Sequence, residues 1–282
     1  MTSSGGSGPR RTGRERAAEA RRQQAAAERR RKQFIVGGVV VALIALAVLI
    51  GVLVQHNQSN SNKSARDAYG AGQPFAAPSG VAPSPGTTSD PGAIVYGKAS
   101  AKVTVEVDED VRCPFCKEAE SFFGSTNKEY ADAGKIQVHY RLVDLIDRNG
   151  GGQGSLVGGA TLACAADVGQ AEFIAFHDLI YKNQPNETND SYGSVDTMLN
   201  LASQVPNLRS ATFDQCARSG KYAQWIKDNY TWLSKKLGGS VGTPDIYIDG
   251  TPFTLKDPTA VPGTQQTADY KAALDAAVAK QG

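Results

Sequence analysis

The fold of this 282-residue chain is decided by residues 103–116, which read VTVEVDEDVRCPFC. Residues 103–107 alternate apolar and polar side chains, as a half-buried strand does, and residues 117–123 after the motif suit a helix. Cys113 is therefore predicted at a helix N-terminus. Unpaired backbone N–H groups and the positive end of the helix dipole stabilise a thiolate there. The two-residue spacer keeps Cys116 within reach, so the stretch predicts a reactive dithiol.

Further strands and helices are predicted around this stretch. Residues 93–96 read as a strand that precedes 103–107, with 97–100 as the turn, and residues 136–143 read as a third strand. Strand, helix and strand together form a βαβ unit. The Gly-rich residues 149–154 then lead into a helical subdomain, about 155–237, with amphipathic spacing. Its predicted helices cover residues 160–168, 171–182, 195–205, 212–219 and 221–236.

The last part of the chain is predicted to return to the sheet. Residues 242–253 begin with Thr243-Pro244. They are then predicted to form a strand, a hairpin turn at Asp249-Gly250 and a short second strand. A terminal helix over about 268–280 closes the chain. The class of the globular part is therefore α/β.

The N-terminal third differs in composition from the rest. Residues 1–33 carry ten Arg or Lys against three Glu, a net of +7, whereas the whole chain has a net charge of +2. Such a tail can bind nucleic acid, but here it is followed directly by the apolar run 34–54. Basic residues beside a membrane span fix its orientation. We therefore expect a basic cytoplasmic tail and no nucleic-acid partner.

The run 34–54 contains no charged residue. As a helix it would extend for about 31 Å, close to the hydrocarbon thickness of a bilayer. A cleaved signal peptide is the alternative, but it would have a shorter apolar region and a small-residue cleavage site. The prediction is a single-pass protein of the cell membrane, with its N-terminus in the cytoplasm and its C-terminal part outside.

Residues 55–91 are rich in Ser, Asn, Pro and Gly, which predicts a flexible tether. The globular domain is predicted to begin at residue 92 and to run to 282. All four cysteines lie in this exported portion, where an oxidising environment allows disulfides to persist.

The combination of a βαβ unit with Cys-Pro-x-Cys, a helical insertion and Val-Gly-Thr-Pro before a hairpin resembles the thioredoxin superfamily in its DsbA-like branch. The resemblance extends over residues 93–282 and implies a thioredoxin fold with an inserted helical subdomain. Within the branch, the chain is most similar to membrane-anchored DsbA-like proteins of mycobacteria and related actinobacteria. The residues that carry this similarity are Asp108-Glu109-Asp110, the pair Cys164 and Cys216, and Ser219-Gly220-Lys221-Tyr222.

The resemblance implies roles for the residues of the motif. Cys113 would be the attacking sulfur and Cys116 the resolving, more buried one, with Pro114 and Phe115 between them. Phe115 offers neither a hydrogen bond nor a positive charge, so we expect a less extreme oxidant than DsbA. The alternatives are an inert disulfide or half of a zinc site. A zinc site needs four ligands, and the three histidines are not spaced as partners. No metal or cofactor is therefore expected.

Thr243-Pro244 is the second element of the implied site. In the superfamily this proline is cis and faces the active disulfide, and the residue before it pairs with a substrate peptide. The Thr243 hydroxyl is also expected to hydrogen-bond a thiolate. The alternative is an ordinary turn proline.

A buried acid in the strand below the resolving cysteine is common in the superfamily, but the position six residues before Cys113 is Val107. Glu106 and Asp108 flank it, and strand register decides whether either reaches the site. The alternative is that residues 108–110 form a solvated acidic turn, with Asp110 as a helix cap. His177 is interpreted as an ordinary helix residue at the edge of the core.

Cys164 and Cys216 have no neighbouring Cys-x-x-Cys partner. They are predicted to form a structural disulfide between two helices of the insertion. The alternative is a second redox relay.

The function expected from these features is that of an enzyme, a DsbA-like protein thiol-disulfide oxidoreductase that introduces disulfides into exported proteins. Its substrates would be unfolded or reduced polypeptides. The resemblance suggests a DsbB-like or VKOR-like membrane partner that re-oxidises it. Two alternatives remain open: a disulfide reductase or isomerase, and a non-catalytic thioredoxin-like module that binds a partner or a metal.

Overall fold

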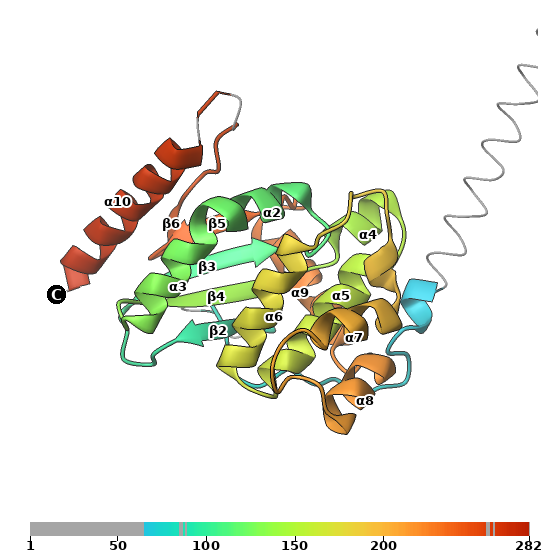
Figure 1. Ribbon diagram of the computed structural model, residues 1–282. Helices are drawn as coiled ribbons and strands as arrows, with labels where there is room; N and C mark the ends of the chain where they lie inside the picture. The colour runs from blue at the N-terminus through green and yellow to red at the C-terminus, as the bar shows by residue number, and fades with distance from the viewer. Residues whose placement is uncertain (1–64, 85–86, 88, 258–259, 262, 282) are drawn as a thin grey trace, which may run out of the picture. The chain divides into compact units, whose positions relative to one another are not determined.

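A mixed sheet organises the computed structural model, which describes residues 65–84, 87, 89–257, 260–261 and 263–281 (Figure 1). The described residues contribute six strands, in the order β1-β2-β4-β3-β5-β6. Their bounds are Val81–Ala82 (β1), Ala93–Gly97 (β2), Val103–Glu109 (β3), Ile136–Leu142 (β4), Asp245–Ile248 (β5) and Thr251–Pro252 (β6). Strands β3 and β4 are parallel, and every other neighbouring pair is antiparallel. The α/β class predicted from the sequence is confirmed.

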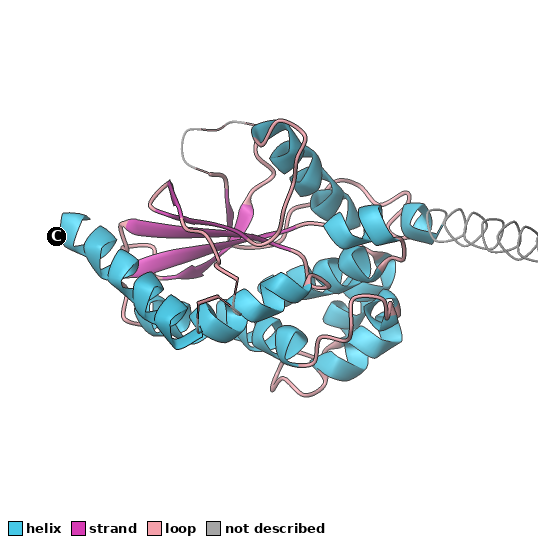
Figure 2. Ribbon diagram, turned by 90° about the horizontal axis from the view of Figure 1, so that it is seen from above, coloured by secondary structure: helices cyan, strands magenta, loops and turns pink. Residues whose placement is uncertain are grey.

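The crossover between β3 and β4 is helical, so the predicted βαβ unit is present. It consists of α2 (Pro114–Ala119), a single π-helical turn η1 (Glu120–Gly124) and α3 (Ser125–Asp132). A π-turn within a helix is rare and is frequent at functional sites. The C-terminal helix α10 (Gly263–Gln281) packs on the same face of the sheet, where the rings of Phe123 and Tyr270 stack at 4.4 Å. Figure 2 shows the sheet between helices on its two faces.

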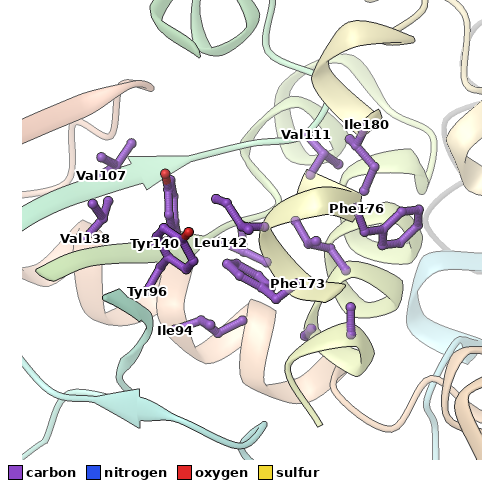
Figure 3. Packing of buried hydrophobic residues seen from close by; sticks show 14 of the residues in the cluster. Ile94, Tyr96, Val107, Val111, Val138, Tyr140, Leu142, Phe173, Phe176 and Ile180 are labelled. Atoms are coloured by element: carbon purple, nitrogen blue, oxygen red, sulfur yellow. The ribbon is translucent and has the colours of Figure 1, made fainter. Parts of the chain in front are cut away.

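The helical subdomain occupies nearly the predicted range. Its elements are α4 (Leu145–Gly150), α5 (Gly154–Ala166), α6 (Gln170–Lys182), η2 (Ser191–Gly193), α7 (Val195–Ala202), α8 (Ala211–Ser219) and α9 (Ala223–Lys236). Helix α4 was not predicted, because its sequence ends in the Gly-rich stretch that reads as a loop. Apolar residues of β4 such as Tyr140 and Leu142 meet Phe173, Phe176 and Ile180 of α6, which joins the subdomain to the sheet (Figure 3).

The two remaining cysteines are bonded to each other. Cys164 in α5 and Cys216 in α8 form a disulfide that closes a sequence separation of 52 residues. Both are buried in the core of the subdomain. Helices α5 and α8 therefore form the linked pair, as the sequence predicted.

Replacing both Cys164 and Cys216 with Ala is expected to lower the free energy of unfolding by about 4 kcal/mol, because a loop of this length no longer restricts the unfolded chain. Urea unfolding of the oxidised protein measures the change. The reactivity of Cys113 towards a small disulfide should stay the same. A variant of unchanged stability that had lost thiol exchange would instead support the redox-relay alternative.

The chain before residue 92 differs from the predicted tether where the structure describes it. The Tyr69 hydroxyl donates to the carbonyl oxygen of Ala217 at 2.6 Å, and the Trp225 indole N–H donates to that of Pro91 at 3.0 Å. Gly220 ends α8 in the left-handed region, where a Cβ would lie 2.6 Å from the backbone nitrogen of Gly70. The segment is attached through the Tyr69 side chain and through backbone groups, which its low apolar content did not reveal.

No helix among the residues described by the structure is long and apolar enough to cross a membrane. The predicted cytoplasmic tail, 1–33, and the predicted transmembrane helix, 34–54, both lie outside the described residues.

Candidate active site

Cys113 occupies the N-cap of α2, as the sequence predicted. Its carbonyl oxygen accepts hydrogen bonds from the backbone N–H groups of Cys116 and Lys117 at 3.1 and 3.2 Å. Pro114 fills the first turn, where the missing N–H costs nothing. No side chain caps the helix. The backbone N–H groups of Phe115 and Cys116 also face the Cys113 sulfur and favour its thiolate form.

The two thiols of the motif differ in acidity. A hydrogen bond from the Cys116 side chain, together with Thr243 and the first backbone N–H groups of α2, lowers the pKa of Cys113 to about 6 against the opposing effect of burial. Burial, and then the Cys113 and Glu109 charges, raise the pKa of Cys116 well above its usual value. Both cysteines are free thiols. At neutral pH the pair therefore carries one thiolate, on Cys113.

Thr243 and Pro244 face this thiolate from the other side of the site. Their peptide bond is cis, and when Cys113 is protonated its thiol donates a hydrogen bond to the Thr243 carbonyl oxygen at 3.3 Å. Pro114 and Phe115 are exposed at the tip of the motif, Phe115 by 59%. The structure therefore brings together all the residues that the sequence assigned to the site.

Replacing Thr243 with Val is expected to raise the pKa of Cys113 from about 6, because the Thr243 side chain helps to lower it. At pH values just above 6 a smaller share of the protein should then carry the thiolate. Titration of the ultraviolet absorbance of the thiolate checks this. Replacement by Ser, which keeps the hydroxyl, should leave the titration near that of the parent protein. Identical curves for all three proteins would show that the hydroxyl has no influence.

Gln184 holds the backbone of the motif in place and was not singled out from the sequence. Its amide nitrogen donates to the carbonyl oxygens of Val111 and Cys113 at 2.9 and 3.0 Å. It follows α6, and the Lys117 ammonium donates to its carbonyl oxygen at 3.2 Å. A lone Gln in a loop has no sequence signature for this role.

Neither of the two acids considered from the sequence lies below Cys116. The side chains of Glu106 and Asp108 point to the other face of the sheet. Glu106 pairs there with Lys236 of α9 at 3.0 Å, and Asp108 pairs with Arg141 at 3.0 Å. Alternation along β3 places them opposite Val107. Strand register, which the sequence left open, therefore brings neither of them to the site.

Glu109 is the acid on the correct face. Strand β3 continues to Glu109, two residues beyond the predicted end, so Glu109 lies on the same face as Val107. It is fully buried, and its charge raises the pKa of Cys116. Its Oε1 lies 2.9 Å from Nε2 of His177, which is also fully buried. His177 is therefore a polar residue of the site, and its interpretation as an edge residue is wrong.

Asp110 is buried as well, so residues 108–110 are not a solvated turn. Its carboxylate accepts from the backbone N–H of Arg112 at 2.8 Å and from that of Ile146 at 2.9 Å. It therefore ties the loop before Cys113 to the start of α4 and does not cap α2. Its backbone N–H contacts Cys116 Sγ at 3.5 Å.

A third polar side chain joins Glu109 and His177. Glu120, the first residue of η1, places a carboxylate oxygen within 4.8 Å of theirs. Three ligands are one fewer than a closed zinc site requires, and the His177 imidazole is already hydrogen-bonded to Glu109. Glu109 and His177 thus share a hydrogen bond, and the Glu120 carboxylate lies close to both. The sequence did not predict this cluster, because the strand 103–107 was ended two residues before Glu109.

Comparison with known proteins places the chain in a family. A family model described as thioredoxin matches residues 89–276. A search of the curated proteins found no match. Three solved structures illustrate the similarity of fold. Reduced DsbA from Mycobacterium tuberculosis is 22% identical, with a TM-score of 0.51, and the match covers 67% of this chain and 99% of that one.

The thiol-disulfide oxidoreductase MdbA from Corynebacterium diphtheriae is 23% identical with a TM-score of 0.51, and the match covers 71% of this chain and 99% of that one. Oxidised BdbD from Bacillus subtilis is 20% identical with a TM-score of 0.53, over 66% of this chain and 92% of that one. The matched region contains the dithiol, the helical insertion and the cis-proline. The chain therefore belongs to the thioredoxin family.

Proposed function

We propose that this protein is a membrane-anchored, extracytoplasmic thiol-disulfide oxidoreductase that introduces disulfides into exported proteins. The observation that carries the proposal is the asymmetry of the dithiol. The pKa of Cys113 is lowered to about 6 at the start of α2, and that of Cys116 is raised by burial. Stabilising the thiolate favours the reduced form, which makes the disulfide a better oxidant.

The proposed reaction is thiol-disulfide exchange. In the oxidised protein, a substrate thiolate attacks Cys113 Sγ, the bond to Cys116 breaks, and the electron pair stays on Cys116. A second substrate thiolate then attacks the substrate sulfur of the mixed disulfide. Cys113 leaves as a thiolate, and the substrate keeps the new disulfide.

Substrate peptides are proposed to lie along Thr243-Pro244, where the backbone offers strand-like hydrogen bonds beside Cys113. The exposed ring of Phe115 offers an apolar contact at the same place. This suits reduced, unfolded chains, whose apolar side chains are accessible. A quinone-linked membrane protein of the DsbB or VKOR type is proposed to return the dithiol to the disulfide.

The membrane location rests on the sequence. The apolar run 34–54 after a basic tail supports an anchor with the catalytic domain outside the cell. Fusion of a reporter that is active only outside the cytoplasm to the C-terminus tests this. A silent reporter, with a cytoplasmic reporter active in its place, would contradict the proposed orientation.

Two assays of the purified domain test the activity. The oxidised protein should promote refolding of a reduced protein with several disulfides, and it should reduce insulin only weakly. Strong insulin reduction with poor refolding would identify a reductase. Inactivity in both assays would support a non-catalytic binding module.

A further inference from the structure

The segment before β2 runs across the helical subdomain beside its disulfide. We call residues 69–82 the N-terminal strap. Its first part lies against the end of α8, where the Tyr69 hydroxyl donates to the carbonyl oxygen of Ala217. Its last part contains β1, which pairs with β2 at the edge of the sheet. The strap therefore connects the end of α8 to the sheet.

Asp167, the residue after α5, holds the strap between these two ends. Its Oδ1 accepts hydrogen bonds from the backbone N–H and from the hydroxyl of Ser79, both at 2.9 Å. Its Oδ2 accepts from the Lys221 ammonium at 2.9 Å and from the Tyr222 hydroxyl. Burial alone would raise the pKa of Asp167, but these hydrogen bonds, with that from Tyr222 the strongest, lower it. The carboxylate is therefore ionised at neutral pH and links the strap to the residues that follow α8.

Two glycines form the closest contact of the strap. Gly70 and Gly220 both have positive φ, at 75° and 66°. A Cβ on Gly70 would lie 2.6 Å from the carbonyl oxygen of Gly220 and 2.7 Å from the Cβ of Ala223, so only glycine fits there. Gly220 belongs to Ser219-Gly220-Lys221-Tyr222, one of the stretches that carry the family resemblance. Three of its four residues thus hold the strap, directly or through Asp167.

The strap covers a cavity that reaches the disulfide. The cavity has a volume of about 400 Å³. The residues that line it include Gln73, Pro74, Ala76, Cys164 and Cys216. Within the part of the chain that the structure describes, residues 74–78 form no hydrogen bond to the rest of the protein. A segment that is held only on either side of its middle opens at a low free energy.

The two cysteines of the disulfide differ in exposure. Cys216 is 7% exposed, whereas Cys164 is 1% exposed. Thiol-disulfide exchange requires that a thiolate reach one sulfur of the bond. The accessible sulfur is therefore that of Cys216, and residues 73–76 form the wall of the cavity that restricts the approach to it.

We propose that the strap is a removable cover that controls the reduction of the Cys164–Cys216 disulfide. When residues 73–76 move away, one thiolate of a dithiol reductant attacks Cys216 Sγ, the disulfide bond breaks, and its electron pair stays on Cys164. The second sulfur of the reductant then closes its own disulfide and releases Cys216. The two protons of the reductant end on the two cysteine thiols.

The docked strap thus preserves the bond that stabilises the helical subdomain. A cut or a pull on the chain before Ser79 is expected to make this bond reducible. The proposal goes beyond the proposed function, because it requires no reaction at the Cys113–Cys116 pair.

The test is the rate at which dithiothreitol reduces the Cys164–Cys216 disulfide. The full chain carries Cys113→Ser and Cys116→Ser for this measurement, so that a single disulfide can react. Alkylation of the released thiols, followed by mass spectrometry, gives the rate for each variant of the strap.

Gly70→Ala should raise the rate by about tenfold, because the added Cβ displaces the strap from Gly220 and Ala223. Gly72→Ala is the matched control. Gly72 has nearly the same φ, 76°, but its added Cβ would have no described neighbour within 4 Å. The backbone strain is thus the same without the clash, and the rate should stay close to that of the parent.

Asp167→Ala should also raise the rate by about tenfold, because hydrogen bonds to a charged group no longer hold Ser79. Asp196→Ala on α7 is its control. It removes an exposed ion pair with Arg218 that does not involve the strap, so the rate should be unchanged.

Urea separates release of the strap from unfolding of the whole domain. Unfolding exposes much surface and depends steeply on urea, whereas release of a short segment exposes little. Below the unfolding transition, the rate of reduction should therefore rise only weakly with urea. A steep rise that matches global unfolding would overturn the proposal. So would a rate for Gly70→Ala or for Asp167→Ala that is no higher than that of its control. The active-site cysteines are absent from this assay, so its failure is distinct from a failure of the refolding assay.

Discussion

Cys116→Ser is expected to accumulate a mixed disulfide on Cys113 when the reduced protein meets oxidised glutathione, whereas Cys113→Ser is expected to accumulate none. The reason is the division of roles between the two sulfurs. Cys113 is the thiolate near neutral pH, since its pKa is about 6, and Cys116 is a buried thiol with a raised pKa. Only the Cys113 thiolate can attack an external disulfide, and without Cys116 no second sulfur attacks the mixed disulfide that forms.

Mass spectrometry of the intact protein measures this result as the addition of one glutathione. The rate of addition to Cys113→Ser should be lower by about a thousandfold, because thiolate nucleophilicity is lost together with the lowered pKa. The double variant, with both cysteines changed to Ser, is the control for reaction at Cys164 or Cys216. Equal labelling of the two single variants would show that Cys116 can also attack, and the assigned roles would then be wrong.

Arg141→Met is expected to lower the free energy of unfolding by about 3–5 kcal/mol, because it leaves buried charges without a partner. Arg141 on β4 is fully buried and pairs with Asp90, with Asp108 at 3.0 Å and with Glu106 at 3.6 Å. Its guanidinium also stacks 4.2 Å from the centre of the Trp232 ring. Burial would raise the pKa of Asp90, but Arg141 outweighs it and the pKa is lowered, so Asp90 is ionised and depends on this partner.

Urea unfolding compares this variant with Arg218→Met. Arg218 also forms an ion pair, with Asp196 at 2.7 Å, but both residues of this pair are exposed. Exposed pairs contribute at most about 1 kcal/mol, so Arg218→Met should be close to the parent. A loss below about 1 kcal/mol in Arg141→Met would show that the buried acids take up protons or water at little cost.

Regular alternation and turn chemistry predicted most of the sheet. Residues 93–96 and 136–143 became strands within one residue of their predicted limits, and the Asp249-Gly250 turn formed with positive φ at both positions. These are local signals, and the structure followed them. The pairing of Cys164 with Cys216 was also predicted, because no alternative partner lies nearby in the sequence.

The polar part of the site was predicted poorly, because it depends on register and on long-range contacts. The sequence analysis ended the strand 103–107 at Val107, which drew attention to Glu106 and Asp108. These two acids lie on the face of the sheet that α9 covers. Extending the strand by two residues makes Glu109 the relevant acid. His177 belongs to the site only because α6 folds back over β3. Nothing in an amphipathic helix pattern distinguishes such a histidine from one at the edge of a core.

The central claim is that the Cys113–Cys116 dithiol stabilises its thiolate enough to act as an oxidant. Its reduction potential, measured by equilibration with glutathione, tests this most directly. A thiolate with a pKa of about 6, without a polar residue at Phe115, predicts a value between about −270 mV, as in thioredoxin, and about −120 mV, as in DsbA. A potential at or below about −270 mV would contradict the account, because such a pair would reduce the disulfides that it is proposed to form.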